Sequence, residues 1–175
     1  MTIKGDRQIE TQARRQALCK LSLRLYPDSV LRQPCVPVER FDSTLSDLLA
    51  EMRMLMLANR GIGLAGPQVG VTQQLFIGEI DGFYRVLITP VLQPGSETEP
   101  LIEGCLSLPG VRVNVKRPTH ISVAGFDPHG QRVAWETDGL WARVIQHETD
   151  HRHGVLILDH GPPLDEETIY ERNNY

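Results

Sequence analysis

The chain has 175 residues, a formal net charge of −4 and 41% hydrophobic residues. This length suits one domain with a single core, and the composition excludes wholesale disorder and fibrous repeats. The negative charge argues against binding nucleic acid through phosphate contacts, and no apolar run reaches the roughly 18 residues of a membrane-spanning helix. We therefore expect one soluble domain with neither a nucleic-acid nor a membrane partner.

The cysteine content indicates a reducing compartment. The three cysteines are an odd number at irregular spacing, unlike a disulfide framework, and the N-terminus lacks the apolar segment of a secretory signal. We therefore expect a cytoplasmic location, with Cys19 and Cys35 packed in the interior as free thiols.

Along the first third of the chain the patterns predict two helices. Residues 1–22 form an N-terminal extension, with a short polar helix expected at residues 8–18. Asp42 and Ser43 favour the start of a second helix that ends near Gly61. Apolar residues recur in it at helical spacing, at Leu45, Leu48, Leu49, Met52, Leu55 and Met56.

Strand patterns follow, and then one more helix. Strands are expected at residues 74–78, 84–89, 111–115, 120–126 and 132–135, with turns at residues 81–82 and 127–130. The last helix is predicted to have Asp138 as its cap and Gly154 as its stop. Its buried stripe would be Leu140, Trp141, Val144 and Ile145. This order predicts an α+β fold in a single domain, residues 23–160, followed by a short tail, 161–175.

The last predicted helix carries Gln146-His147-Glu148-Thr149-Asp150-His151. Residues four apart share one helix face, so His147 and His151 can reach one metal ion, and Glu148 can serve as a general base beside it. The alternative is a pair of buried histidines that bind no metal.

A catalytic metal site needs a third protein ligand. Downstream, His160, Glu166 and Glu167 have weak sequence support, because a proline pair and the chain's tail surround them. Upstream, Cys105 lies in Glu103-Gly104-Cys105-Leu106-Ser107, and glycine and proline fix the loop around it. A thiolate ligand at Cys105 accounts best for the set.

A glycine-rich segment at residues 61–70 has the sequence Gly-Ile-Gly-Leu-Ala-Gly-Pro-Gln-Val-Gly. It is not a phosphate-binding loop, because no Lys-Ser/Thr pair ends it and no strand leads into it. Its small residues would let a peptide approach the backbone, and Gln68 offers an amide donor. The alternative is a loop that only ends the helix.

These three segments, in this order, resemble the signature motifs of peptide deformylases, and the resemblance covers residues 23–159. Two departures stand out: Gly66 replaces the family's usual alanine, and Arg152 replaces the leucine that commonly follows the last histidine. Both are packing positions. The resemblance implies antiparallel sheets packed around a central metal-binding helix, and an enzyme that removes the formyl group from N-terminal formylmethionine, releasing formate.

The resemblance also implies the roles of individual residues. Cys105, His147 and His151 would hold one divalent metal with a water. Glu148 would take and deliver the proton, while the Gln68 amide and the Leu106 backbone N–H would stabilise the oxyanion. The substrate-binding residues would be Ile62, Leu101, Leu140 and Val144 around the methionine side chain, Gly63 along the backbone, and Arg112 at the pocket or the peptide.

Ferrous iron is the metal that the resemblance implies, with Zn²⁺, Ni²⁺ or Co²⁺ as substitutes. The expected partners are nascent formyl-Met peptides, met at the ribosome by a monomeric enzyme. Two alternatives stay open. A zinc metallopeptidase would use a downstream third ligand, and a non-catalytic relative would only bind formylated peptides.

Overall fold

The computed structural model describes residues 20–165. The helix predicted at residues 8–18 lies outside this range, as do Cys19 and the tail from residue 166. No helix within the described range is both long and apolar enough to cross a membrane.

Helix α2, Ser43–Ala58, forms where the sequence predicts it. Asp42 is its N-cap, and the Asp42 carboxylate accepts hydrogen bonds from the backbone N–H groups of Thr44 and Leu45. The helix ends just before Asn59, and the N–H of Gly61 bonds back to the carbonyl of Met56. Its apolar stripe is buried against the first strands of the sheet, which fixes the direction in which the chain enters the glycine-rich segment.

Five strands form one antiparallel sheet in the order β1-β2-β3-β6-β7. These strands are β1 (Gly63–Ala65), β2 (Leu75–Ile80), β3 (Phe83–Pro94), β6 (His120–Phe126) and β7 (Arg132–Asp138). Both predicted turns are present. Asp81 and Gly82 have φ values of 51° and 81° in the turn between β2 and β3, and the N–H of Gly130 bonds to the carbonyl of Asp127 between β6 and β7.

A second, two-stranded ribbon consists of β4 (Thr98–Cys105) and β5 (Leu108–Pro118). The sequence predicts only part of β5 and none of β4, whose residues do not alternate and include Pro100. The start of the C-terminal tail packs on this ribbon, because the N–H of Leu164 bonds to the carbonyl of Arg112. Short 3₁₀ helices at Ser29–Arg32, Gly66–Val69 and Ile157–Asp159 connect the other elements.

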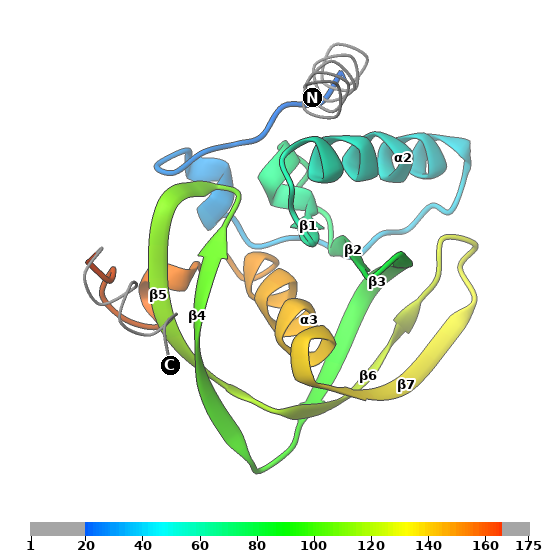
Figure 1. The fold of residues 1–175 in the computed structure, drawn as a ribbon. Helices are drawn as coiled ribbons and strands as arrows, with labels where there is room; N and C mark the ends of the chain where they lie inside the picture. The colour runs from blue at the N-terminus through cyan, green and yellow to red at the C-terminus, as the bar shows by residue number, and fades with distance from the viewer. Residues whose placement is uncertain (1–19, 166–175) are drawn as a thin grey trace, which may run out of the picture.

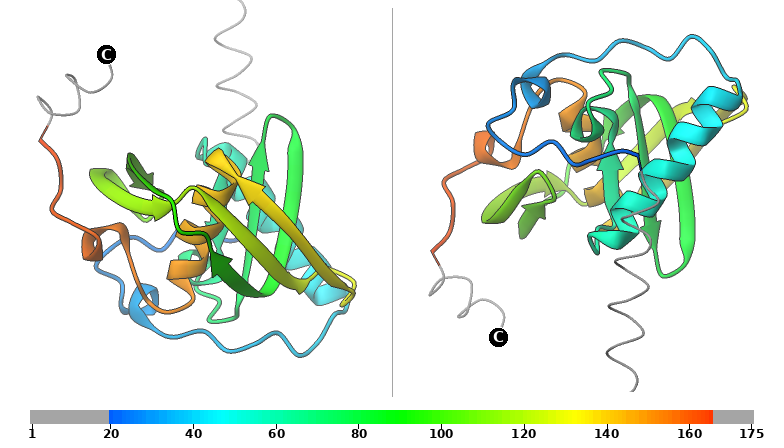
Figure 2. Two further views of the ribbon diagram at one scale, coloured as in Figure 1. Left: turned by 90° about the horizontal axis from the view of Figure 1, so that it is seen from below. Right: turned by 90° about the horizontal axis from the view of Figure 1, so that it is seen from above.

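Helix α3, Gly139–His151, lies between the five-stranded sheet and the β4–β5 ribbon (Figures 1 and 2). Asp138 occupies the predicted N-cap position but makes no capping hydrogen bond through its side chain. The helix ends at His151, and Gly154 follows with a φ of 70°. The prediction that Leu140 belongs to the buried stripe of this helix is wrong. Its side chain is 51% exposed, because it lies in the first turn of α3 beside a cavity. The α+β prediction is confirmed, with α3 at the centre.

Candidate active site

Three metal-binding side chains come together where α3 passes the end of β4. The donor atoms of Cys105, His147 and His151 all lie within 4.8 Å of one another, and Sγ of Cys105 is 3.5 Å from Nε2 of His151. Burial holds the pKa of His151 well below its ordinary value, so the imidazole is neutral, as metal binding requires. One thiol and two imidazoles fit a tetrahedral metal ion that keeps a position open.

A buried carboxylate orients the first of these histidines. Oε2 of Glu103 lies 2.9 Å from Nδ1 of His147, which leaves Nε2 of His147 as the nitrogen available to a metal. Arg117 holds both oxygens of Glu103, at 2.7 and 3.0 Å. Burial alone would raise the pKa of Glu103, but the hydrogen bonds from His147 and Arg117 outweigh it and lower the pKa to about 2. Glu103 therefore stays ionised.

Two more contacts complete this charged cluster. Arg143 on α3 donates to Oε1 of Glu103 at 2.8 Å, and Arg117 also donates to Asp150 at 2.8 Å. His160, a possible third ligand by sequence, lies 2.8 Å from the same Asp150 oxygen instead. Sequence reasoning assigned no role to these partners. Of these partners, only Glu103 could have been inferred from the sequence. Glu103 precedes Cys105 by two residues, and residues two apart on a strand share a face.

Glu148 sits beside the metal-binding group with one oxygen free. The side chain is 5% exposed, and its Oε2 has no hydrogen-bond partner within residues 20–165. Burial raises the pKa of Glu148 to about 7. Its other oxygen faces β1 so closely that a Cβ at Gly63 would lie 2.3 Å from Oε1. This strand position therefore needs a glycine if the carboxylate is to keep its place.

The amide of Gln68 is held in one orientation from the 3₁₀ helix Gly66–Val69. Its Oε1 accepts a hydrogen bond from the N–H of Ala65 at 2.8 Å. This bond turns Nε2 toward Ser107 Oγ, at 3.2 Å, and Cys105 Sγ, at 3.4 Å. Leu106 follows Cys105 in the turn between β4 and β5 and lines the same cavity. An amide donor therefore points toward the metal-binding group.

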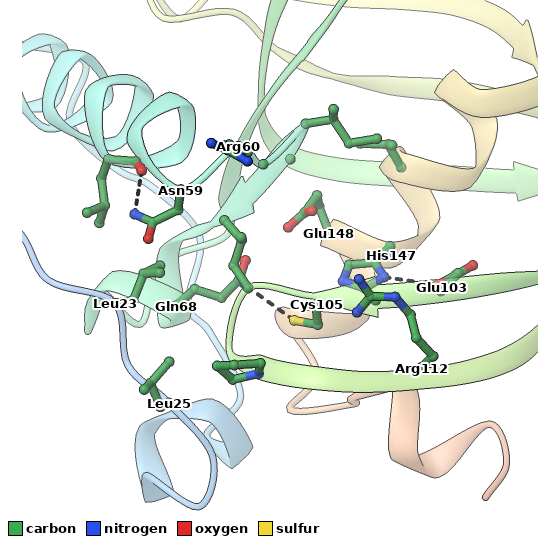
Figure 3. Close-up of a pocket in the computed structure, with 18 of the residues that line it drawn as sticks. Leu23, Leu25, Asn59, Arg60, Gln68, Glu103, Cys105, Arg112, His147 and Glu148 are labelled. Atoms are coloured by element: carbon green, nitrogen blue, oxygen red, sulfur yellow. Dashed lines mark hydrogen bonds and ion pairs between the residues drawn. The ribbon is translucent and has the colours of Figure 1, made fainter. Parts of the chain in front are cut away.

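These groups open onto a cavity of about 1000 Å³. Figure 3 shows Gln68 of the 3₁₀ helix Gly66–Val69, Cys105 of β4, and His147 and Glu148 of α3 converging on it. Most of the residues predicted to contact substrate line this cavity: Ile62, Gly63, Arg112, Leu140 and Val144.

Leu101 is the exception among the predicted pocket residues. It is 45% exposed and is not part of the cavity wall, which contains Ile102 instead. Successive residues of a strand face opposite sides, so the register of β4 decides which of the two can reach the cavity. The N-terminal segment also contributes to the wall through Leu21, Leu23 and Leu25, a contribution that sequence reasoning missed.

Comparison with known proteins gives one family. The model of the polypeptide deformylase family matches residues 20–167. Peptide deformylase of Acidothermus cellulolyticus is 41% identical over 81% of this chain and 78% of its own length. The crystal structure of peptide deformylase from Thermotoga maritima superposes with a TM-score of 0.79 at 38% identity, covering 82% of this chain and 98% of that one.

The actinonin complex of a peptide deformylase from Synechococcus elongatus is similarly close, with a TM-score of 0.80 and 38% identity over 90% of this chain and 86% of that one. The residues matched by the family model contain the whole described range, and with it the three segments that carry the site. The chain therefore belongs to the polypeptide deformylase family.

Proposed function

We propose that this deformylase hydrolyses the formamide bond of N-formylmethionyl peptides with a metal ion held by Cys105, His147 and His151. One observation carries the proposal: the three donor atoms lie within 4.8 Å of one another, and two of them, on Cys105 and His147, line a cavity together with Glu148 and Gln68. Residues with these chemistries can bind a metal, move a proton and stabilise an oxyanion at one point.

The donor set fits a divalent transition metal. When bound, such an ion supplies Lewis acidity, which polarises a carbonyl and lowers the pKa of water toward neutrality. Glu103 fixes the His147 ring by its bond to Nδ1, and the two arginines on Glu103 keep that carboxylate in place. We propose ferrous iron, with Zn²⁺, Ni²⁺ or Co²⁺ able to substitute, because thiolate and imidazole donors bind all four.

Glu148 is the residue that can take and return a proton. Its side chain lines the cavity, and its Oε2 has no hydrogen-bond partner among the described residues, so the carboxylate can accept a proton from water and later deliver it to the departing amine nitrogen. The close packing of β1 at Gly63 leaves the carboxylate little freedom to turn away.

Gln68 is placed to stabilise the oxyanion that forms when the formyl carbon is attacked. Its Oε1 is engaged by Ala65, so the amide cannot turn over without losing that bond, and Nε2 stays directed at the cavity. The backbone N–H of Leu106 is the second donor that we propose. One such donor is typically worth roughly 3–4 kcal/mol in the transition state.

The apolar part of the cavity wall would bind the methionine side chain of the substrate. Ile62 and Leu140 are 43% and 51% exposed, although both are large aliphatic residues, and they line the cavity together with Val144. We propose that Ile102, rather than Leu101, contacts this side chain, because Ile102 lines the cavity and Leu101 does not. Burying a methionine side chain on this wall would contribute roughly 2 kcal/mol to binding.

The experiment is formate release from formyl-Met-Ala-Ser by the metal-loaded protein and by the Glu148→Gln variant. The amide keeps the size of the side chain but cannot act as a base, so we expect turnover to fall by roughly 10²–10⁴-fold. Metal content, measured by atomic emission, should stay near one per chain.

Glu136→Gln is the matched control, because the Glu136 side chain is 72% exposed on β7 and does not line the cavity. It should behave as the native protein does. Turnover of Glu148→Gln near the native rate would contradict the proposed role. Absence of formate release by the native protein, with internal peptide bonds cleaved instead, would favour a metallopeptidase.

A further inference from the structure

The cavity extends well past the metal-binding group. Its volume of about 1000 Å³ lies at the upper end of small-molecule sites, which run to roughly that size. The far wall is built from the end of α2, at Asn59 and Arg60, and from the segment at Leu21 to Leu25. A peptide with formylmethionine at the metal would therefore meet this outer wall with the residues that follow.

The carboxylates of the cavity wall are buried, whereas its exposed charged groups are positive. Glu103 and Glu148 are buried at 6% and 5% exposure, and Glu103 is neutralised by two arginines. The two exposed charged residues of the wall are both arginines, Arg60 from the end of α2 and Arg112 from β5. In a chain with a net charge of −4, the open part of the cavity is thus positive.

Neither arginine has an acidic partner in the described part of the chain. Among residues 20–165, no carboxylate lies within ion-pair distance of Arg60 or Arg112, whereas nearby Arg53 is paired with Glu79 at 2.7 Å. Figure 3 shows the two side chains on different sides of the cavity, Arg60 near Asn59 and Arg112 near Cys105. An acidic group entering the cavity would therefore meet two guanidinium groups that are not paired with any carboxylate of the described residues.

Each arginine also sits in a constrained position. Arg60 has a φ of 57°, a left-handed conformation that glycine adopts at the end of a helix at the least cost. Strained residues of this kind cluster at binding sites. Arg112 donates a hydrogen bond from Nη1 to the carbonyl of Val111 at 3.0 Å, and its guanidinium lies over Gly104, next to Cys105.

We propose, resting on the deformylase function above, that Arg60 and Arg112 form a carboxylate-selecting rim. The rim favours formylmethionyl peptides with aspartate or glutamate among the first three residues after methionine, and disfavours lysine and arginine there. The formyl group removes the positive charge of the peptide's N-terminus, so the side chains that follow decide its net charge near the cavity. Partly exposed charge pairs are individually weak, so we expect several-fold effects on kcat/KM from each arginine.

The test uses formyl-Met-Ala-X-NH₂ peptides in which X is Asp, Asn or Lys. The C-terminal amide removes the terminal carboxylate, which would otherwise satisfy the same arginines, and Asn matches Asp in shape. With X as Asp we expect kcat/KM to exceed that with X as Lys by roughly tenfold, mainly through KM. The ratio should shrink between 50 and 500 mM NaCl because salt screens exposed charges. Moving Asp to the position after methionine then shows where the rim acts.

The variants are Arg60→Gln, Arg112→Gln and the double substitution. Each should lower the Asp-to-Lys ratio, and the double variant should bring it close to one. Arg132→Gln is the matched control, since Arg132 is an exposed arginine of β7 that does not line the cavity. It should keep the native ratio. Equal turnover of the three peptides by the native protein, or a preference that survives in the double variant, would overturn the proposal.

Failure of the proposed deformylase function can be told apart from failure of the rim proposal. If the protein were not a deformylase, even the neutral Asn peptide would release no formate. In that case the same ranking is measured by binding alone, with N-acetyl-Met-Ala-X-NH₂ peptides and isothermal calorimetry. Tighter binding of the Asp peptide, lost in the double variant, supports the rim. Equal affinities for the Asp and Lys peptides refute it whatever the reaction is.

Discussion

Replacing Gly63 by alanine tests whether the packing of β1 fixes the position of Glu148. The added Cβ would lie 2.3 Å from Oε1 of Glu148, 2.9 Å from its Cδ and 3.0 Å from Cγ1 of Val144. Ordinary non-bonded carbon contacts lie near 3.5–4.0 Å, so the carboxylate must retreat by about 1 Å or β1 must move by a similar distance. A shift of this size at a reacting group costs roughly a hundredfold in rate.

The stability of the variant should also fall, because overpacking a filled site costs about 1–3 kcal/mol. At roughly 2–4 °C per kcal/mol for a chain of this length, the Tm should drop by roughly 2–12 °C. Metal content should persist, since the added methyl group would not meet any of the three metal-binding side chains among its nearest atoms. The assays are formate release, differential scanning fluorimetry and atomic emission on the same preparation.

Gly161→Ala is the control for the loss of a glycine itself. A Cβ there would meet its nearest atom, Cγ1 of Val113, at an ordinary 3.6 Å. This variant should keep native turnover and lose little stability. If Gly63→Ala turned over substrate like Gly161→Ala, the close approach of β1 to Glu148 would have no catalytic consequence and the argument would fail.

The remaining predictions concern the metal-binding group and its supports. Cys105→Ala, His147→Ala and His151→Ala should each lose the metal, and full metal content in any of them would refute that ligand. Gln68→Ala should keep the metal and lose roughly 10²–10³-fold in turnover, as measured by formate release; a native rate would place oxyanion stabilisation elsewhere. Glu103→Gln should lower metal affinity by roughly 10–100-fold in competition with a chelator, and lower the free energy of unfolding by about 3–5 kcal/mol, because it leaves buried arginine charges without their partner.

The parts of this fold that the sequence predicts are those with local signals. The helix stripe around Met52, the Asp81-Gly82 turn and the four-residue spacing of His147 and His151 each depend on neighbours in the chain. Strand β4 has no such signal, because Pro100 and the run of exposed residues before Ile102 hide its alternation. Its pairing with β5, rather than its own composition, makes it a strand.

The charged cluster behind the metal-binding group escaped prediction for a different reason. Glu103 is 14 residues from Arg117 and meets it through the pairing of β4 with β5, whereas Arg143, 40 residues away, reaches Glu103 because α3 packs against this ribbon. The sequence also predicts Leu101 in the cavity wall where the structure has Ile102, because the face on which each residue lies depends on the register of β4. Sequence can identify the residue types that a site needs, but it does not show which distant partners support them.

The two departures from the family pattern have local explanations that leave the reacting groups unchanged. A Cβ at Gly66 would lie 2.7 Å from the carbonyl oxygen of Val71 and 2.8 Å from that of Gln73, so this backbone admits no side chain there. Both obstacles are backbone atoms that a rotamer change cannot move. The absence of a Cβ lets the loop after Gln68 fold close against Gly66, whose carbonyl accepts the N–H of Val71 at 3.0 Å.

Arg152, the second departure, is also accommodated by the groups around it. Its guanidinium donates to the carbonyl of Pro90 on β3, and its own carbonyl accepts the N–H of Cys35 at 2.8 Å. The polar end of the side chain thus satisfies a carbonyl of β3, while its backbone ties the end of α3 to the N-terminal segment. His151, one residue earlier, keeps its 1% exposure and its place beside Cys105. Each departure is thus accommodated by the chain segment that faces it, residues 71–73 in the case of Gly66 and Pro90 of β3 in the case of Arg152.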